Sequence, residues 1–174
     1  MKKSILLLLC TMLISFPLLS LDMVPESMQA VLILKILSFV KNFERGIQSE
    51  GITIGIYGAN TILPAFDAAA KKLPFKVNFV SIPENLLNLE RVQLLYIPRG
   101  SSATVFEKIN AMTKRNKILT VSGDPNAGLD FNCTLSFYIN NDNPKILINM
   151  KSAKEEDINF SSKVLGLADV RNMK

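Results

Sequence analysis

The sequence predicts a single-domain α/β sandwich with an open, largely parallel sheet that ends in an antiparallel hairpin, together with an apolar N-terminal helix. Short, continuous apolar runs alternate with helix-period segments between residues 52 and 122, which is typical of strands buried in a parallel sheet. The runs at 131–139 and 145–151 are separated by the turn sequence NNDNP, which predicts the hairpin.

The beginning of the chain has the two parts of a secretory signal. Lys2 and Lys3 form a basic region, and an apolar run follows them. Ser20 is small enough to precede a cleavage site, but a leucine fills the second small position, so an uncleaved membrane anchor is the alternative. We expect residues 1–20 to be a signal peptide and residues 21–174 to form one exported α/β domain in the periplasm.

Composition limits the possible functions. Histidine is absent, which excludes Ser-His-Asp and Cys-His catalysis and removes the commonest transition-metal ligand. The formal net charge of +5 includes the two leader lysines and is too small to argue for a nucleic-acid partner. Cys133 is the only cysteine after the leader, so no internal disulfide is possible there. We expect a protein that is not an enzyme and that uses no metal or cofactor.

A helical pattern runs from Pro25 to about Arg45, and its polar stripe is narrow. One interpretation is a helix buried in the core. In the other, one flank packs on a second subunit or a partner protein, and the interface residues would include Leu34, Leu37 and Phe39.

The remaining elements follow from periodicity and turn residues. We expect strands at residues 52–58, 75–80, 92–97, 118–122, 131–139 and 145–151, and helices that begin after Thr61, at Ser101 or Ser102, at Ser152 and at Ser161. The run at 75–80 alternates between apolar and polar residues in a way that suits an edge strand.

Two details concern sidedness. Within the run 131–139, alternation places Cys133 among the inward residues and Thr134 and Ser136 on a solvated face. The sequence KEED at 154–157 is predicted to be a solvated helix face.

A ligand site can be predicted from topology. In an open α/β sheet the ligand crevice lies outside the carboxyl ends of the strands, at the point where the winding direction reverses. With strand 75–80 at the edge, the reversal falls between strands 52–58 and 92–97. The loops after these two strands contain Gly58, Asn60, Arg99, Ser101 and Ser102. They suit a small anionic or polar molecule, and the alternative is that they are turn and capping residues.

Asp124, Asn126, Gly128 and Asp130 stand at alternate positions, and oxygen ligands at such spacing occur in calcium loops. The loop lacks a bidentate glutamate at its far end, because Leu135 occupies that position, so we expect a turn and no metal site.

Two segments carry a resemblance to a known family. ILTVSG at 118–123 resembles the ILTVSD strand of the YfiR-like family of exported bacterial regulators, and NFSSKVLGLADV at 159–170 resembles its closing segment ISSKLLRLARV. The resemblance covers nearly the whole chain after the leader. The family commonly has a cysteine where Val92 stands and often a Gly-Gly pair where Asn132 and Cys133 stand, so a family disulfide is not carried over.

The resemblance implies a non-enzymatic periplasmic regulator or sensor that binds and modulates a membrane signalling partner. That partner is typically a diguanylate cyclase, so the protein would affect cyclic-di-GMP output and biofilm behaviour. Members of the family are also linked to histidine kinases, and dimers are common among them. The alternative function is a structural or assembly component of the bacterial cell envelope.

Overall fold

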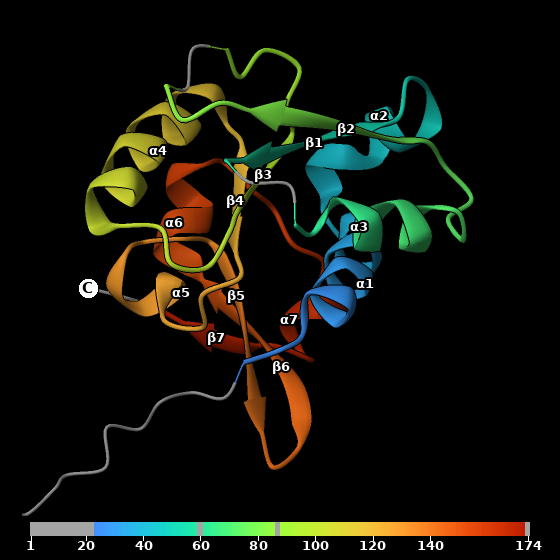
Figure 1. The fold of residues 1–174 in the computed structure, drawn as a ribbon. Coiled ribbons are helices and arrows are strands. Elements are labelled where there is room, and N and C mark those ends of the chain that lie inside the picture. The colour runs from blue at the N-terminus through green and yellow to red at the C-terminus, as the bar shows by residue number, and fades with distance from the viewer. Residues whose placement is uncertain (1–22, 59–60, 86–87, 173–174) are drawn as a thin grey trace, which may run out of the picture.

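The computed structural model describes residues 23–58, 61–85 and 88–172 and shows a mixed α/β domain (Figure 1). The predicted signal peptide lies outside the described residues. Seven strands form one sheet in the order β2-β1-β3-β4-β5-β6-β7. All neighbouring pairs are parallel except β5 and β6, which form the antiparallel hairpin. The predicted fold class is therefore confirmed.

The elements have the following bounds. The strands are β1 Ile52–Tyr57, β2 Val77–Ile82, β3 Leu94–Ile97, β4 Leu119–Ser122, β5 Leu135–Asn140, β6 Asn143–Asn149 and β7 Asp169–Arg171. The helices are α1 Glu26–Leu37, a 3-10 turn at Lys41–Phe43, α2 Glu44–Gln48, α3 Leu63–Ala70, α4 Ala103–Asn116, α5 Ala127–Asp130, α6 Met150–Glu155 and α7 Ser162–Leu165. No helix among these is long and apolar enough to cross a bilayer.

Two apolar cores lie on opposite faces of the sheet. Alternate residues of β3 face opposite ways, so Tyr96 packs with residues of α1 and α3 while Leu95 packs with residues of α4. Figure 1 shows α1 and α3 on one side of the sheet and α4 on the other. Helices therefore cover both faces, which is why β3 is a continuous apolar run in the sequence. On the α1 and α3 side, Phe66 anchors the core with ring contacts to Phe79 and Tyr96 at centroid distances of 5.3 and 5.9 Å.

The sheet topology confirms two predictions. β2 is an edge strand and pairs with β1, and β3 lies on the other side of β1. The chain leaves β1 toward α3 on one face and leaves β3 toward α4 on the other, so the winding direction reverses between these two strands, as predicted (Figure 1).

The first helix differs from its prediction. α1 ends at Leu37 and the chain then bends, because Val40 forms an isolated antiparallel bridge with Phe160. Leu34 and Leu37 are 1% and 0% exposed, so the prediction that they contact a partner is corrected: these two side chains belong to the core.

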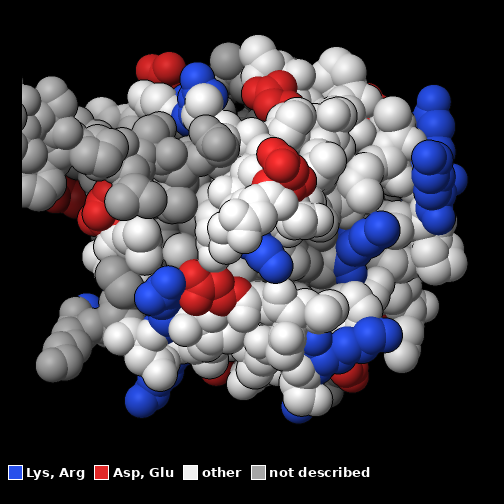
Figure 2. Space-filling view, turned by 90° about the horizontal axis from the view of Figure 1, so that it is seen from below, with Lys and Arg blue, Asp and Glu red and all other residues white. Residues whose placement is uncertain are grey.

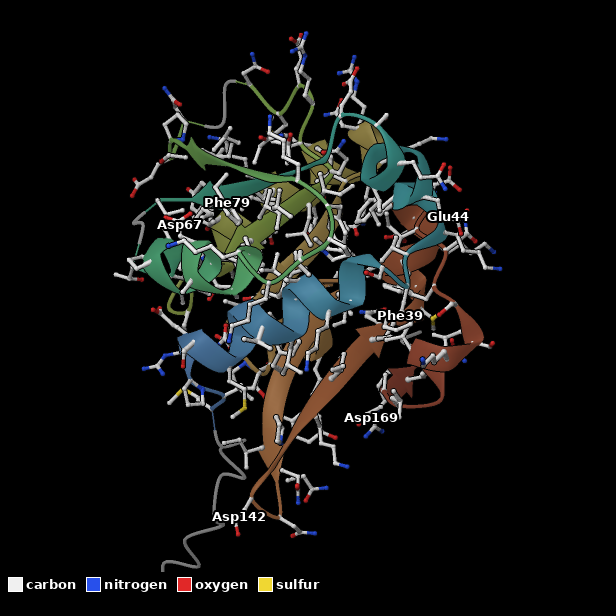
Figure 3. All side chains as sticks on the ribbon, turned by 90° about the vertical axis from the view of Figure 1, so that its right-hand side faces the viewer. Phe39, Glu44, Asp67, Phe79, Asp142 and Asp169 are labelled. Carbon is white, nitrogen blue, oxygen red and sulfur yellow. The ribbon has the colours of Figure 1, made fainter. Side chains whose placement is uncertain are left out.

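Phe39, two residues after the end of α1, is half-buried (Figure 3). The Nζ of Lys163 lies 5.2 Å from the centroid of its ring, a distance that allows a cation–π contact. The exposed apolar side chains of α1 are instead Met28 and Val31, which stand closer to its N-terminal end.

The hairpin also differs in two respects. β5 begins at Leu135 rather than at Phe131. Thr134, just before the strand, and Ser136, within it, are fully buried, so the prediction of a solvated face is wrong for these two residues. The physical reason is that other parts of the chain cover this face. The Ser136 hydroxyl donates to the Pro125 carbonyl (3.2 Å) in the loop before α5, and the Thr134 hydroxyl donates to the Glu156 carboxylate (2.6 Å) at the end of α6. Only the far part of the hairpin is solvated, with Asp142 at its tip (Figure 3).

Charges of both signs are scattered over the surface seen from below in Figure 2. No field of one sign covers that face. This distribution agrees with the small net charge of the sequence, which gives no argument for nucleic-acid binding.

Cys133 is fully buried, and its thiol donates to the Leu135 carbonyl at 3.3 Å. Burial and then the Glu156 carboxylate raise the pKa of the thiol, so the reactive thiolate is scarce. We expect thiol labelling of the native protein to be slower than in denaturant by on the order of 100-fold, because labelling requires opening of the core. A Cys133→Ala, Ser81→Cys variant, which places the thiol on the exposed edge strand, is the control and should label rapidly. A disulfide-linked dimer on a non-reducing gel would contradict the prediction.

Candidate functional site

The predicted ligand residues lie at the carboxyl ends of β1 and β3. Gly58 and the segment 98–102 line one pocket of about 410 Å³, together with Tyr57, Glu84 and Val105. Asn60 lies outside the described residues. The structure therefore brings together four of the five predicted residues: Gly58, Arg99, Ser101 and Ser102.

Both serines in this pocket already have structural partners. The Ser101 hydroxyl donates to the Pro98 carbonyl at 2.9 Å, and the Ser102 hydroxyl accepts from the Val105 amide at 3.4 Å as the N-cap of α4. Glu84 adds a carboxylate to the same wall, which disfavours an anion. On this side of the segment, turn and capping chemistry accounts for the two serines.

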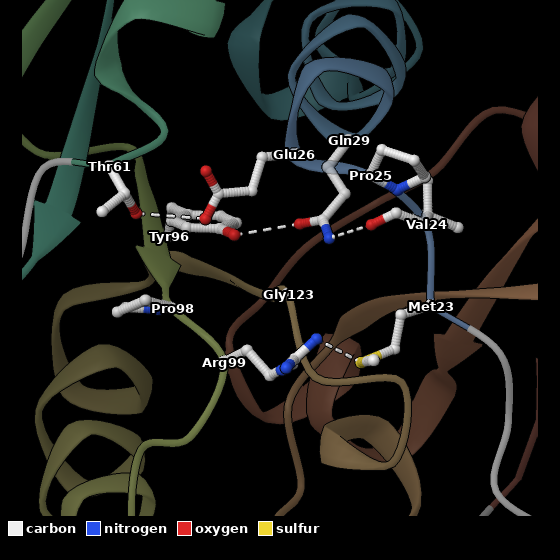
Figure 4. A pocket seen from close by; sticks show the side chains of 10 residues that line it. All are labelled: Met23, Val24, Pro25, Glu26, Gln29, Thr61, Tyr96, Pro98, Arg99 and Gly123. Carbon is white, nitrogen blue, oxygen red and sulfur yellow. Dashed lines mark hydrogen bonds between the residues drawn. The ribbon is translucent and has the colours of Figure 1, made fainter.

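The Arg99 side chain lies on the other side of the segment. One of its guanidinium nitrogens contacts the sulfur of Met23, and the side chain lines a second pocket of about 680 Å³ (Figure 4). This pocket lies between the start of α1 and the ends of β3 and β4. We call it the Arg99 pocket; its lining is Met23, Val24, Pro25, Glu26, Gln29, Thr61, Tyr96, Pro98, Arg99 and Gly123.

The floor of the Arg99 pocket is a buried hydrogen-bond chain. The Tyr96 hydroxyl donates to Gln29 Oε1 at 2.9 Å, and Gln29 Nε2 donates to the Val24 carbonyl at 2.7 Å (Figure 4). Burial, and then the Glu26 carboxylate, raise the pKa of Tyr96, so its hydroxyl stays neutral. Gly123 leaves room for this chain, since a Cβ there would lie 2.5 Å from the Tyr96 oxygen.

The rim of the Arg99 pocket carries both signs of charge. Glu26 accepts a hydrogen bond from the Thr61 hydroxyl at 3.0 Å, and Arg99 stands across the opening (Figure 4). Within the described part of the chain these two residues form no ion pair with each other. A mouth with separate charges above a neutral polar floor suits the binding of a polar small molecule.

Sequence reasoning missed the floor of this pocket. Gln29 stands on an apolar helix face and Tyr96 in an apolar strand, and a polar group at such a position needs a buried partner. A polar residue at an apolar position could have identified Gln29 and Tyr96 as candidates. It could not have predicted that the two side chains form a hydrogen bond with each other.

A second buried polar group was also missed. Glu156, in the KEED sequence that was predicted to be solvated, is 0% exposed. Its flanking residues Glu155 and Asp157 do face solvent and pair with Lys114 and Lys117 at 2.6 and 2.7 Å. The prediction is therefore wrong for Glu156 alone. In the loop 124–130, the Asp124 carboxylate accepts from the Asn126 amide at 2.9 Å, which is turn chemistry.

The fold and the pocket together define a doubly wound α/β domain with a polar crevice at the switch point of its sheet. The chain belongs to the YfiR/HmsC-like family, whose sequence model matches residues 26–169. This family is associated with periplasmic regulation of diguanylate cyclase signalling and is regulatory rather than catalytic.

Among solved structures, the chain is similar to the ABC domain from Streptococcus pneumonia determined in complex with L-Trp. The identity is 17% and the TM-score is 0.51, over 74% of this chain and 58% of that chain. The likeness concerns the fold, and this chain spans little more than half of that structure. No curated protein matches the chain.

Proposed function

We propose that the protein is an exported, non-enzymatic regulator that binds and modulates a membrane signalling partner such as a diguanylate cyclase. The observation that carries the proposal is the family match over residues 26–169, which spans almost the whole described domain. In this proposal the protein acts in the periplasm as a sensor, and its effect appears as a change in cyclic-di-GMP and biofilm. A histidine kinase is the other partner that fits, and a homodimer is compatible with this role.

The test is to co-express the chain with the membrane diguanylate cyclases of its own host and to measure cyclic-di-GMP. We expect a change of about 2-fold or more with at least one cyclase, and crosslinking of the protein to that cyclase. A chain without residues 1–20 is the control and should have no effect, because it would not be exported. Equal effects of both forms, or none, would overturn the proposal. Stoichiometric copurification with an envelope complex at constant cyclic-di-GMP would favour the structural alternative.

We also propose that a small polar or anionic ligand binds at the switch point with Arg99 as its charged contact. The support is the position of Arg99 on the rim of a pocket of about 680 Å³, where a guanidinium can form paired hydrogen bonds to a carboxylate or phosphate.

A thermal-shift screen of nucleotides, amino acids and cell-wall fragments tests the ligand. A compound that raises the Tm of the wild type should raise that of Arg99→Ala by less than half as much, because the charged contact is lost. Arg115→Ala, which removes an exposed arginine outside the Arg99 pocket, is the matched control and should respond like the wild type. Equal stabilisation of all three proteins would place the site elsewhere.

A further inference from the structure

Glu156 is a buried carboxyl group that forms no ion pair within the described part of the chain. It follows α6 directly and is 0% exposed. Lys114, in the last turn of α4, pairs with Glu155, and Lys117, the C-cap of α4, pairs with Asp157. The nearby lysines therefore pair with the two sequence neighbours of Glu156 and not with Glu156. A buried carboxyl group of this kind needs hydrogen-bond donors or a proton.

Three threonines supply the donors. Oε1 accepts from the hydroxyls of Thr120 and Thr113 at 2.7 and 3.3 Å. Oε2 accepts from the Thr134 hydroxyl at 2.6 Å and from the Thr120 amide at 3.1 Å. These residues come from α4, from β4 and from the segment just before β5, so one side chain ties three parts of the domain to the end of α6.

The cluster can hold the carboxyl group in either protonation state. The Thr120 hydroxyl also accepts from the Thr134 amide at 2.9 Å, so its orientation is set. The Thr113 hydroxyl has a choice, because the Asn110 carbonyl lies 3.4 Å away as a second acceptor. When Glu156 is ionised, all four donors point at it. When it is protonated, Thr113 can turn its hydrogen to Asn110 and accept the carboxyl proton.

We infer that Glu156 with Thr113, Thr120 and Thr134 forms a proton latch, which takes up and releases one proton and so changes how firmly α6 and the C-terminal arm are held. The arm is residues 157–161, which pair with the chain after α1. The Lys41 amide donates to the Asn159 carbonyl and the Ser161 amide donates to the Phe39 carbonyl, both at 2.9 Å. The latch is independent of the proposed partner and ligand.

The titration range follows from burial. Desolvation, which outweighs the four hydrogen bonds, raises the pKa of Glu156 from its ordinary 4.5 to about 7. Because the folded-state pKa is the higher one, this group contributes stability that is complete below about pH 4.5 and is lost as the pH rises through about 7. The ionised latch is therefore the weaker one, and the arm should open more often at alkaline pH.

No other titratable group described around Glu156 accounts for a protonation change near pH 7. Burial raises the pKa of the neighbouring Cys133 thiol, which stays neutral across this range, and β4 carries no titratable side chain. Around α6 the charged groups are Lys151, Lys154, Glu155 and Asp157. On α4 and its cap they are Glu107, Lys108, Lys114, Arg115 and Lys117. Four of them form the two ion pairs described above.

The test combines a direct titration with amide exchange. In wild-type protein with ¹³C-labelled glutamate, one carboxyl resonance should titrate near pH 7, and it should be absent from Glu156→Gln. Protection of the Thr120, Lys41 and Ser161 amides, corrected for intrinsic exchange, should fall about tenfold from pH 5.5 to 8.5 in the wild type. It should be nearly constant in Glu156→Gln, whose amide mimics the protonated carboxyl.

The matched control is Glu155→Gln, the same chemical change one residue away on the solvated side, which should keep the wild-type profile. A carboxyl midpoint below pH 5 would overturn the inference, and so would arm protection that is independent of pH in the wild type. If Glu156→Gln does not fold, the titration and exchange of the wild type still decide between these outcomes.

Discussion

Replacing Phe66 with alanine is expected to lower the free energy of unfolding by about 3 to 5 kcal/mol. The side chain is 0% exposed and packs between α3 and the sheet, with ring contacts to Phe79 and Tyr96. Alanine removes this apolar surface and leaves a cavity, because β1, β3 and α1 hold the surrounding core in place. Chemical denaturation followed by circular dichroism measures the change.

The matched control for this prediction is Phe75→Ala. Phe75 precedes the edge strand β2 and is only half-buried, so its removal should cost less than half as much. Equal losses for the two variants would show that Phe66 does not anchor the core as the structure indicates.

Gly51→Ala is the second variant with a large expected effect, a loss of about 3 kcal/mol in the free energy of unfolding. Gly51 has φ +90°, a region that L-residues rarely adopt, and a Cβ there would lie 2.6 Å from the Lys76 carbonyl oxygen. That oxygen already accepts from the Ile52 amide at 3.0 Å, so a backbone shift would disturb the first pairing of β1 with β2.

Gly58→Ala separates the cost of the positive φ from the cost of the Cβ clash. Gly58 also has a positive φ, +66°, but no atom of the described residues lies within 4 Å of the place that a Cβ would take, so only the backbone cost of about 1 kcal/mol remains. If both variants lose the same stability, the clash at Gly51 is relieved by relaxation and the larger prediction is wrong. Thermal and urea unfolding of the two proteins give the comparison.

Local patterns were enough to predict the sheet and its winding. Continuous apolar runs identified β3 and β4 as central strands, and the half-exposed pattern identified β2 as an edge strand. The reason is that a strand buried on both faces is apolar throughout, whereas a strand with one solvated face alternates. Once β2 was placed at the edge, the handedness of parallel connections determined where the winding reverses. The loops that follow β1 and β3, which contain Gly58 and Arg99, were identified from this step.

The same local patterns failed where a long-range contact decides the environment. Thr134 reads as solvated from alternation, yet it donates to Glu156, which lies 22 positions later in the chain. β7 was not predicted because a three-residue strand has no periodicity of its own and exists only by pairing with β6.

The sequence by itself determined the α/β class, the order of the first three strands and the loops at the point where the winding reverses, because these depend on periodicity and on chain connectivity. Only the tertiary structure decided that the Arg99 side chain turns toward the start of α1 and that Glu156, alone among its acidic neighbours, points inward. A rotamer and a buried carboxyl group are set by atoms that approach from distant parts of the chain: Met23 in the first case and three threonines in the second. These contacts form only when the sheet and its helices pack together.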